Sequence, residues 1–388
     1  MKGNSLNRRK FFTILGAGSA VLATGSLKGL ASNGFQEKSK PSTNINEAGR
    51  TPRNQNSMPG KYPGKVIWVK NTKSVVNDQP VELVAYQMLQ KAMLGLTGQE
   101  DLKKAWRIFV NPGEKIGLKV NPVAGKLLTT SHAVVKSVVK QLTESGINRK
   151  DIIIWDRREM ELKDTGFTQE NYPGIKITGT EQQDEKGLFV DSDGKLYGER
   201  NIDRAWYYWA DVEGEYDAET MPYMLNGGKF SYYTKIVTQE VDKIINIPIL
   251  KNAGGSVTNA MKNLAFGSVS NTGRLHTQLW NETCAEVCAF APVRDKVVLN
   301  ICDALRGCFN GGPGANPQFI CNYNSLLASS DPVAMDRIGY DIIAAKRIAE
   351  GLLKVPAPES LTFLAMATAL GLGVSDKNKI EMKMVDLG

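Results

Sequence analysis

The strongest constraint on the fold is a repeated alternation between short apolar runs and segments with helical spacing. Apolar runs typical of buried strands lie at 66–70, 115–120, 152–155, 243–248 and 297–302, with a shorter one near 326–328. Helical patterns lie at 81–94, 132–144, 333–349 and 358–369. Strand–helix–strand repeats favour parallel strands with right-handed crossovers. The sequence therefore predicts an α/β fold with one or more mostly parallel sheets flanked by helices.

Composition shifts divide the chain into five parts. We expect an export signal over 1–31, a flexible linker over 32–64, a first α/β half over 65–162, an insertion over 163–235, and a second α/β half with a C-terminal helix over 236–388. The linker is predicted because its segment is rich in Ser, Asn, Pro, Gly, Lys and Glu and nearly lacks apolar residues.

The first residues have the pattern of an export signal. The run Asn7-Arg8-Arg9-Lys10-Phe11-Phe12 precedes a weakly apolar stretch, and small residues surround Ala31. Paired arginines followed by an aromatic residue resemble the twin-arginine type, which predicts the twin-arginine export machinery as a partner and the periplasm or cell envelope as the destination. A membrane anchor or a disordered basic tail are the alternatives. The glycines that break the apolar stretch favour cleavage over a stable transmembrane span.

The segment 163–235 differs from the rest of the chain. Asp191-Ser192-Asp193-Gly194 and Asn226-Gly227-Gly228 are hairpin-turn signals between short strand-like runs. Aromatic residues at 206–209 either stack on a ligand or pack onto the main domain, and packing is the favoured interpretation. We expect a hairpin-rich insertion or lid.

Polar residues concentrate between Lys251 and His276. Ser256 is a suitable cap for a helix over 257–266 that Gly267 would close. Thr258, Lys262 and Asn263 fall on the side of that helix opposite its apolar residues. Two ammonium groups beside a helix N-terminus suit a phosphate or carboxylate. The alternative is a solvated helix face with an incidental histidine.

A second polar group stands where the strand at 115–120 ends and the next helix begins. It comprises Lys119, Asn121, Thr130 and His132. Thr130 or Ser131 is expected to cap the helix, and contact with a ligand in addition remains open.

Aspartates recur at strand ends and helix starts, at Asp156, Asp303, Asp331 and Asp336. Together they suit Mg²⁺, Ca²⁺ or acid–base chemistry, whereas each alone suits a cap or a turn, which is the favoured interpretation. The loop 311–316 lacks the Gly-Lys-Ser/Thr ending of a phosphate-binding loop, so an ordinary tight loop is expected. No metal ligand is assigned.

Several pieces, taken in order, resemble the domain of unknown function 362 family in its twin-arginine-exported branch. The most specific are Lys262-Asn263-Leu264 and Asp331-Pro332-Val333-Ala334-Met335-Asp336, and the similarity runs over roughly 66–349. The resemblance implies an α/β domain without an established biochemical role. Some relatives have a ferredoxin-like module, but the five cysteines here contain no C-x-x-C, so an iron–sulfur cluster is not expected. Cys284 and Cys288 share a helix face, and buried thiols or disulfides are favoured over a metal site.

Charge argues against nucleic acid as a partner. The formal net charge is +8, but five positive charges precede residue 32, which leaves +3 for the remainder. Our leading hypothesis is an exported protein that binds a small anionic ligand in a strand-end cleft, either as an enzyme or as a binding protein. In it, His276, Asp303 and Lys262 are catalytic candidates, with Asp303 orienting His276 or holding a divalent metal. The expected ligand-binding residues are Lys119, Asn121, Thr130, Lys251, Thr258 and Asn263. The alternatives are a non-catalytic scaffold in the cell envelope and a redox protein loaded with a cofactor before export.

Overall fold

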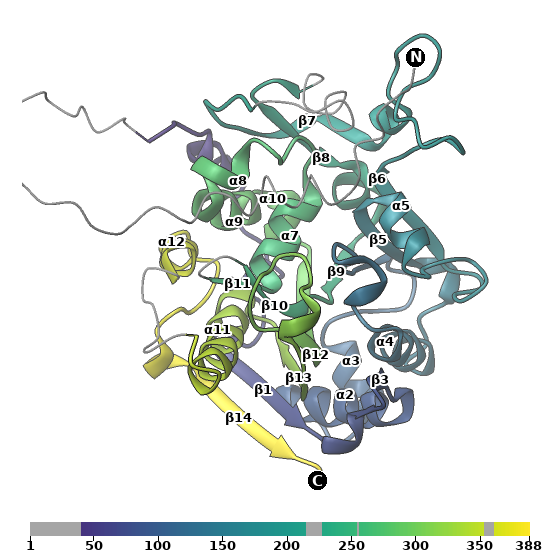
Figure 1. Cartoon of the computed structure of the whole chain (residues 1–388), viewed down its shortest axis with the longest axis vertical. Coiled ribbons are helices and arrows are strands. Elements are labelled where there is room, and N and C mark those ends of the chain that lie inside the picture. The colour runs from purple at the N-terminus through teal and green to yellow at the C-terminus, as the bar shows by residue number, and fades with distance from the viewer. Residues whose placement is uncertain (1–39, 215–226, 254–255, 353–360) are drawn as a thin grey trace, which may run out of the picture. The chain divides into compact units, whose positions relative to one another are not determined.

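A large mixed sheet organises the part of the chain that is described, which comprises residues 40–214, 227–253, 256–352 and 361–388 of a computed structural model (Figure 1). These residues belong almost entirely to one compact unit, Pro41–Gly388. Along the sheet the strand order is β14 (Glu381–Asp386), β1 (Lys65–Lys70), β13 (Ile320–Ser329), β12 (Val297–Cys308), β9 (Lys243–Asn246), β4 (Ile116–Lys119), β5 (Ile152–Arg158) and β6 (Lys176–Glu181).

The central strands are parallel, as the repeating pattern predicts. β12, β9, β4, β5 and β6 all run in one direction, and β14 is parallel to β1. β13 is antiparallel to both of its neighbours, β1 and β12. The predicted α/β fold is confirmed. The edge strand β14 was not predicted, because its alternating charged and apolar residues give no buried run.

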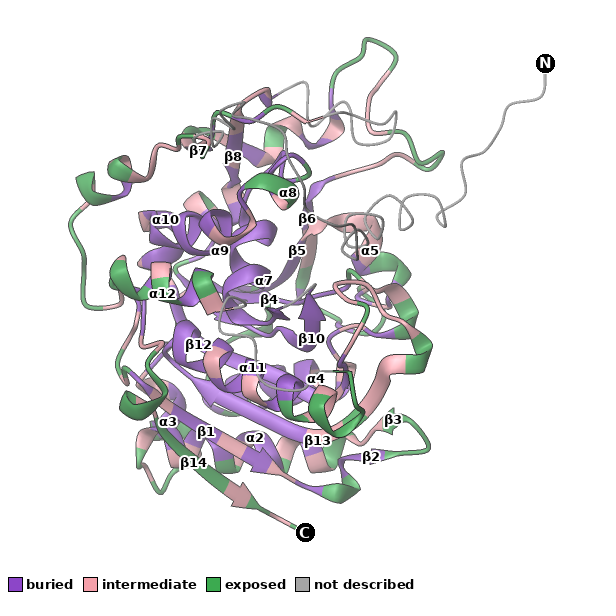
Figure 2. Ribbon diagram, turned by 60° about the vertical axis from the view of Figure 1, so that its left-hand side comes forward, coloured by how far each residue is buried: buried purple, intermediate pink, exposed green. Residues whose placement is uncertain are grey.

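Helices cover both faces of the sheet, and each face has its own apolar core. Ile116, Leu118 and Ile154 belong to the core under α2 (Glu82–Thr97), α3 (Leu102–Arg107) and α4 (His132–Glu144). Ile153, Trp155 and Ile244, from alternate strand positions, belong to the core on the other face with α7 (Ala260–Ser268), α9 (Trp280–Ala289), α11 (Pro332–Ala349) and α12 (Thr362–Ala369). Figure 2 shows the central strands and α7 as buried. The shorter helices are α5 (Glu159–Asp164), α8 (Leu275–Gln278) and α10 (Ala291–Arg294).

The stretch after β9 folds differently from the helix expected over 257–266. Residues on either side of 254–255 form an antiparallel hairpin, β10 (Ile249–Ala253) with β11 (Ser256–Thr258), and β10 also runs parallel to β12. The helix α7 begins only at Ala260, so the expectation that Ser256 caps it is wrong. Its cap is Asp336 of α11, whose carboxylate oxygens accept hydrogen bonds from Ala260 N at 2.6 Å and Met261 N at 2.9 Å.

The insertion is partly what the turn signals predict. β7 (Ile202–Trp209) and β8 (Phe230–Thr234) form an antiparallel pair outside the main sheet, but β6 inside the same segment is a strand of the main sheet. The aromatic residues of β7 pack onto the body: Tyr208 is fully buried and its hydroxyl donates to Glu286 Oε2 at 2.8 Å. A further small pair is β2 (Val75–Val76) with β3 (Gln79–Pro80).

Residues 40–64 are held against the body instead of forming the flexible linker that composition predicts. Met58 is fully buried, and its backbone N donates to Arg294 O at 2.8 Å. The Arg294 guanidinium in turn donates to Ala48 O and Thr51 O at 3.2 and 2.9 Å. The contacts come from residues far along the chain, which is why local composition does not reveal them. Residues 32–39 of the expected linker and the whole expected signal over 1–31 lie outside the described residues.

None of the helices in the described ranges has the length and apolarity needed to cross a membrane.

Candidate functional site

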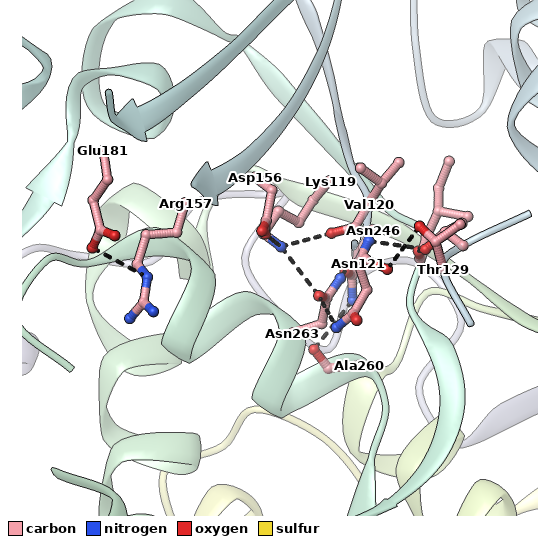
Figure 3. Close-up of polar contacts among 12 residues, drawn as sticks. Lys119, Val120, Asn121, Thr129, Asp156, Arg157, Glu181, Asn246, Ala260 and Asn263 are labelled. Carbon is pink, nitrogen blue, oxygen red and sulfur yellow. Dashed lines mark hydrogen bonds and ion pairs between the residues drawn. The ribbon is translucent and has the colours of Figure 1, made fainter. Parts of the chain in front are cut away.

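The site is built on a buried lysine at the end of β4. Lys119 is the last residue of that strand, and its ammonium forms an ion pair with Asp156 of the neighbouring strand β5 (Figure 3). The same Nζ donates to Val120 O at 2.8 Å and to Asn263 Oδ1 at 3.1 Å. A Cβ at position 267 would overlap the end of the Lys119 side chain, so only glycine fits on α7 there.

A chain of asparagine side chains extends this network along the ends of the strands. Asn263 Oδ1 accepts from Asn121 Nδ2 at 3.0 Å, and Asn263 Nδ2 donates to Asn246 Oδ1 at 2.8 Å. Asn246 Nδ2 donates to Asn300 Oδ1 at 3.0 Å, and Lys251 Nζ donates to Asn121 Oδ1 at 2.9 Å. All of these amides are buried and paired, which makes the network a single rigid unit. Asn246 and Asn300 were missed from the sequence, although Asn246 is, like Asp156, a polar residue at the end of a buried run.

Thr130 has a structural role in this network. Its hydroxyl donates to Ile247 O at 2.9 Å and accepts from Asn121 N at 2.9 Å. It thereby fixes the turn in which Asn121 lies. The cap of α4 is Ser131, whose hydroxyl accepts from Val134 N at 3.4 Å.

Lys251 and Thr258 face each other across the β10–β11 hairpin. Lys251 is fully buried, and burial together with the nearby charge of Lys262 lowers its pKa to about 7. The buried hydroxyl of Thr258 has no hydrogen-bond partner within the described residues. An unpaired buried hydroxyl is costly, so this atom suits a ligand or a water.

Lys262 is the most unusual cation of the site. Only 7% of Lys262 is exposed to solvent. Its Nζ lies 5.7 Å from the ring centre of Phe266 and 5.8 Å from that of Trp280. Among the described residues, hydrogen bonds are found from the neighbouring Met261 and Asn263 but none is found from this Nζ, and it forms no ion pair there. Burial lowers the pKa of Lys262 to about 8. The electrostatic interaction with Cys284 acts in the opposite direction and raises it.

His276, on α8, lies beside Lys262 of α7. Its ring packs on Phe266 with centres 4.4 Å apart, and its Nδ1 lies 3.0 Å from Thr272 O. Because a carbonyl only accepts, Nδ1 bears the proton and Nε2 is left as an acceptor. Burial first, then the charges of Lys262 and Arg157, lower the pKa of His276 to about 3. The imidazole is therefore neutral at physiological pH and is unsuited to donate a proton there.

Asp303 does not join the other two catalytic candidates. Its carboxylate accepts from Ser131 N at 2.6 Å and from Leu305 N at 3.1 Å, so it holds the start of α4 against β12 and does not orient His276. Burial raises its pKa. The structure thus brings Lys262 and His276 together. Asp303 lies apart from them, in β12, where it positions the start of α4.

Arg157 is a site residue that the sequence reasoning missed. It follows Asp156 in β5, and its guanidinium hydrogen-bonds Thr272 Oγ1 while its Nε lies 3.3 Å from Glu181 Oε1 (Figure 3). Thr272 therefore joins Arg157 to His276. The sequence does hold one sign of this role: Arg157 directly follows Asp156, where the buried part of β5 ends.

The remaining candidates are engaged in local structure. His132 lies 2.7 Å from the Tyr172 hydroxyl and 2.9 Å from Thr165 O, and Asp331 caps α11 by accepting from Ala334 N at 2.8 Å. In the loop 311–316, Gly312 N donates to Asn252 Oδ1 at 2.8 Å. Across the described ranges no three His, Cys, Asp or Glu side chains gather as metal ligands would, and all five cysteines are free thiols.

The core of the network is close-packed. The two best-defined depressions among the described residues lie away from it. One, of about 550 Å³, is lined by Gln99, Asp101, Lys103, Lys104, Arg107 and Ile108; the other, of about 270 Å³, by Glu159, Gln182, Gln183, Tyr197 and Arg200. Lys119, Lys251 and Asn263 are internal groups. Within the part of the chain that the structure describes, the site keeps some exposure at Lys262, His276, Arg157 and Trp280, and we take this as the side of approach for a ligand.

Comparison with known proteins gives a partial family match and no activity. Residues 215–341, about a third of the chain, match the sequence model of a domain of unknown function (DUF362). No curated protein matches the chain. Among solved structures, a crystal structure of a protein from Thermotoga maritima is similar with a TM-score of 0.35 and 9% identity. That alignment covers 71% of this chain and 60% of the other. So low a structural similarity says nothing about function.

The buried charge of Lys251 predicts a pH-dependent stability. Its pKa is about 7 in the folded protein and near 10.5 when unfolded, so the unfolded chain binds this proton more tightly. The charged form opposes folding below pH 7, and the effect fades as the pH rises toward 10.5. Relative to Lys251→Met, the wild-type free energy of unfolding should rise over this window by about 1.4 kcal/mol per unit of pKa shift.

Urea unfolding of both proteins at a series of pH values checks this expectation. Lys383→Met is the matched control, because Lys383 is exposed on β14, and it should follow the wild type at every pH. A constant difference between wild type and Lys251→Met would show that Lys251 has an ordinary pKa.

Proposed function

We propose that this protein binds a small anion bearing a carboxylate or phosphate, at the exposed side of the buried network where Lys262, His276 and Arg157 meet. One observation supports this most: Lys262 is more than nine-tenths buried, and its ammonium has no hydrogen-bond acceptor within the described residues. Burial of an unpaired charge costs several kcal/mol, so such a group is retained where a counter-charge binds.

Neighbouring groups supply the rest of an anion site. Arg157, which also pairs with Glu181, adds a second positive charge, and the neutral His276 has a free ring nitrogen that accepts a hydrogen bond from a hydroxyl or a protonated acid. The buried Thr258 hydroxyl, at the end of β11 and opposite Lys251, has no partner within the described residues and adds a donor. Positive charge, a hydroxyl and aromatic walls together suit a small polar acid better than a macromolecule.

The alternative of a scaffold that docks partners through the aromatic insertion has less support. Tyr208 is bonded to Glu286 inside the protein, and Trp206 packs against the core. Those rings stabilise the fold and do not form an open docking face.

Anion binding predicts a ligand-dependent rise in melting temperature that requires Lys262. Inorganic phosphate or succinate, added at constant ionic strength, should stabilise the wild type by about 2.7 kcal/mol at a hundredfold excess over Kd. Lys262→Met should remove this response while folding normally, because it replaces an unpaired cation by an apolar chain of similar length.

The control for this experiment is Lys383→Met, which should respond as the wild type does. Equal stabilisation of wild type and Lys262→Met would place the anion elsewhere, and no stabilisation of either protein would refute the proposed function.

We also propose that the chain is exported by the twin-arginine route, on the basis of Arg8, Arg9 and the aromatic residues that follow them. Conversion of both arginines to lysine keeps the charge but removes the recognised pair, and it should leave the protein in the cytoplasm of an exporting host. Cell fractionation measures this, with Lys10→Arg as the control. Undiminished appearance of the Arg8→Lys, Arg9→Lys variant in the periplasm would contradict the proposal.

A further inference from the structure

The surroundings of Lys262 suit an amine that acts as a nucleophile as well as an ammonium that binds an anion. Its amine is approached by the faces of Phe266 and Trp280 and has no carboxylate partner, in contrast to Lys119, which is paired with Asp156. A lysine among aromatic rings and close to other cations loses its proton readily, and the free amine is then available for attack on a carbonyl carbon.

We propose that Lys262 forms an imine with a small acid that bears an aldehyde or ketone, such as a 2-oxo acid. The inference deepens the proposed function and rests on it, since the positive groups that bind an anion would hold the carboxylate of this acid.

The chemistry balances without a further reactant. The lone pair of the neutral amine forms a C–N bond to the carbonyl carbon, and the carbonyl oxygen takes up the proton that leaves nitrogen, which gives a carbinolamine. Loss of its hydroxyl with one proton as water breaks the C–O bond and leaves a C=N bond. Amine and carbonyl thus give imine and water, and no electron acceptor or donor is needed.

The positions of the neighbouring side chains fit the product. A protonated imine keeps the positive charge of the lysine, and the faces of Phe266 and Trp280 attract such a cation. The neutral His276, packed on Phe266, has its Nε2 free to accept the hydroxyl proton of the carbinolamine in a hydrogen bond. Arg157, which pairs with Glu181 and hydrogen-bonds Thr272, lies near His276 and brings positive charge toward the substrate carboxylate.

Accessibility separates Lys262 from the other two buried lysines of the site. Lys119 and Lys251 are 1% and 0% exposed and are bonded to Asp156 and Asn121, so a substrate cannot reach them. Lys262 is 7% exposed and stands beside the half-buried residues His276 and Trp280. Within the site, the reaction should therefore be confined to the Lys262 amine.

Reductive trapping on the full-length protein tests the inference. Pyruvate or glyoxylate with cyanoborohydride should add one carboxyalkyl group, located at Lys262 by peptide mapping. Labelling of Lys262 should be about tenfold or more faster than that of exposed lysines, which are mostly protonated at the same pH. Lys262→Met should lose this fast label, and Lys383→Met should keep it.

Two results would overturn the inference: equal labelling of Lys262 and surface lysines, or a fast label that persists in Lys262→Met. If phosphate stabilises the wild type through Lys262 but no fast label forms, imine formation is refuted and anion binding stands. If propionaldehyde labels Lys262 as fast as glyoxylate does and no anion stabilises the protein, anion binding is refuted. A fold defect in Lys262→Met does not affect the comparison, because the label is mapped in the wild type.

Discussion

The side-chain amide of Asn263 is the junction on which this structure depends. Its oxygen accepts from Lys119 and Asn121, and its nitrogen donates to Asn246, so one residue of α7 ties together the ends of β4 and β9 and the turn after β4. In a close-packed interior, each of these polar groups would cost about 1–3 kcal/mol if left unpaired. These bonds therefore fix the position of α7 above the strand ends and its rotation about its own axis. Its start is fixed separately by the Asp336 carboxylate, whose own pKa burial raises to about 8. Because α7 is fixed at both places, Lys262 has a defined position between Phe266 and Trp280.

The division of charges follows from this arrangement. Lys119 meets Asp156 and is a structural cation, whereas Lys251 meets only an amide oxygen and Lys262 only aromatic rings. The described interior thus contains cations near Lys262 with too little negative charge beside them, which is the physical basis for proposing an anionic ligand. The DUF362 match over 215–341 contains β9, β10, β11, α7 and β12, so the family region supplies Lys251, Lys262 and His276. Lys119, Asp156 and Arg157 come from strands outside it.

Much of the fold was predictable from the sequence because the central strands and helices are locally consistent. The run Ile152-Ile153-Ile154-Trp155 is apolar on both faces, as a central parallel strand must be, and α4 and α11 carry their own N-caps. The error at 257–266 has a different cause. The cap of α7 comes from Asp336, 75 residues beyond Met261, and 249–258 is extended because β10 pairs with β12. Lys119, Asn121, Lys251 and Asn263 were expected to bind a ligand, from two separate polar groups of the sequence. The structure joins them by hydrogen bonds into one buried framework, and this burial depends on packing that a local pattern does not record.

The central claim is that Lys262 is a buried lysine with no counter-charge of its own. A carbon-13 NMR titration of the lysine Cε signals tests it most directly, with the Lys262 signal assigned by its loss in Lys262→Met. We predict a midpoint near pH 8 without ligand, well below the value of 10.5 for an ordinary lysine, and an upward shift when phosphate is added. A midpoint near 10.5 that phosphate leaves unchanged would contradict the account.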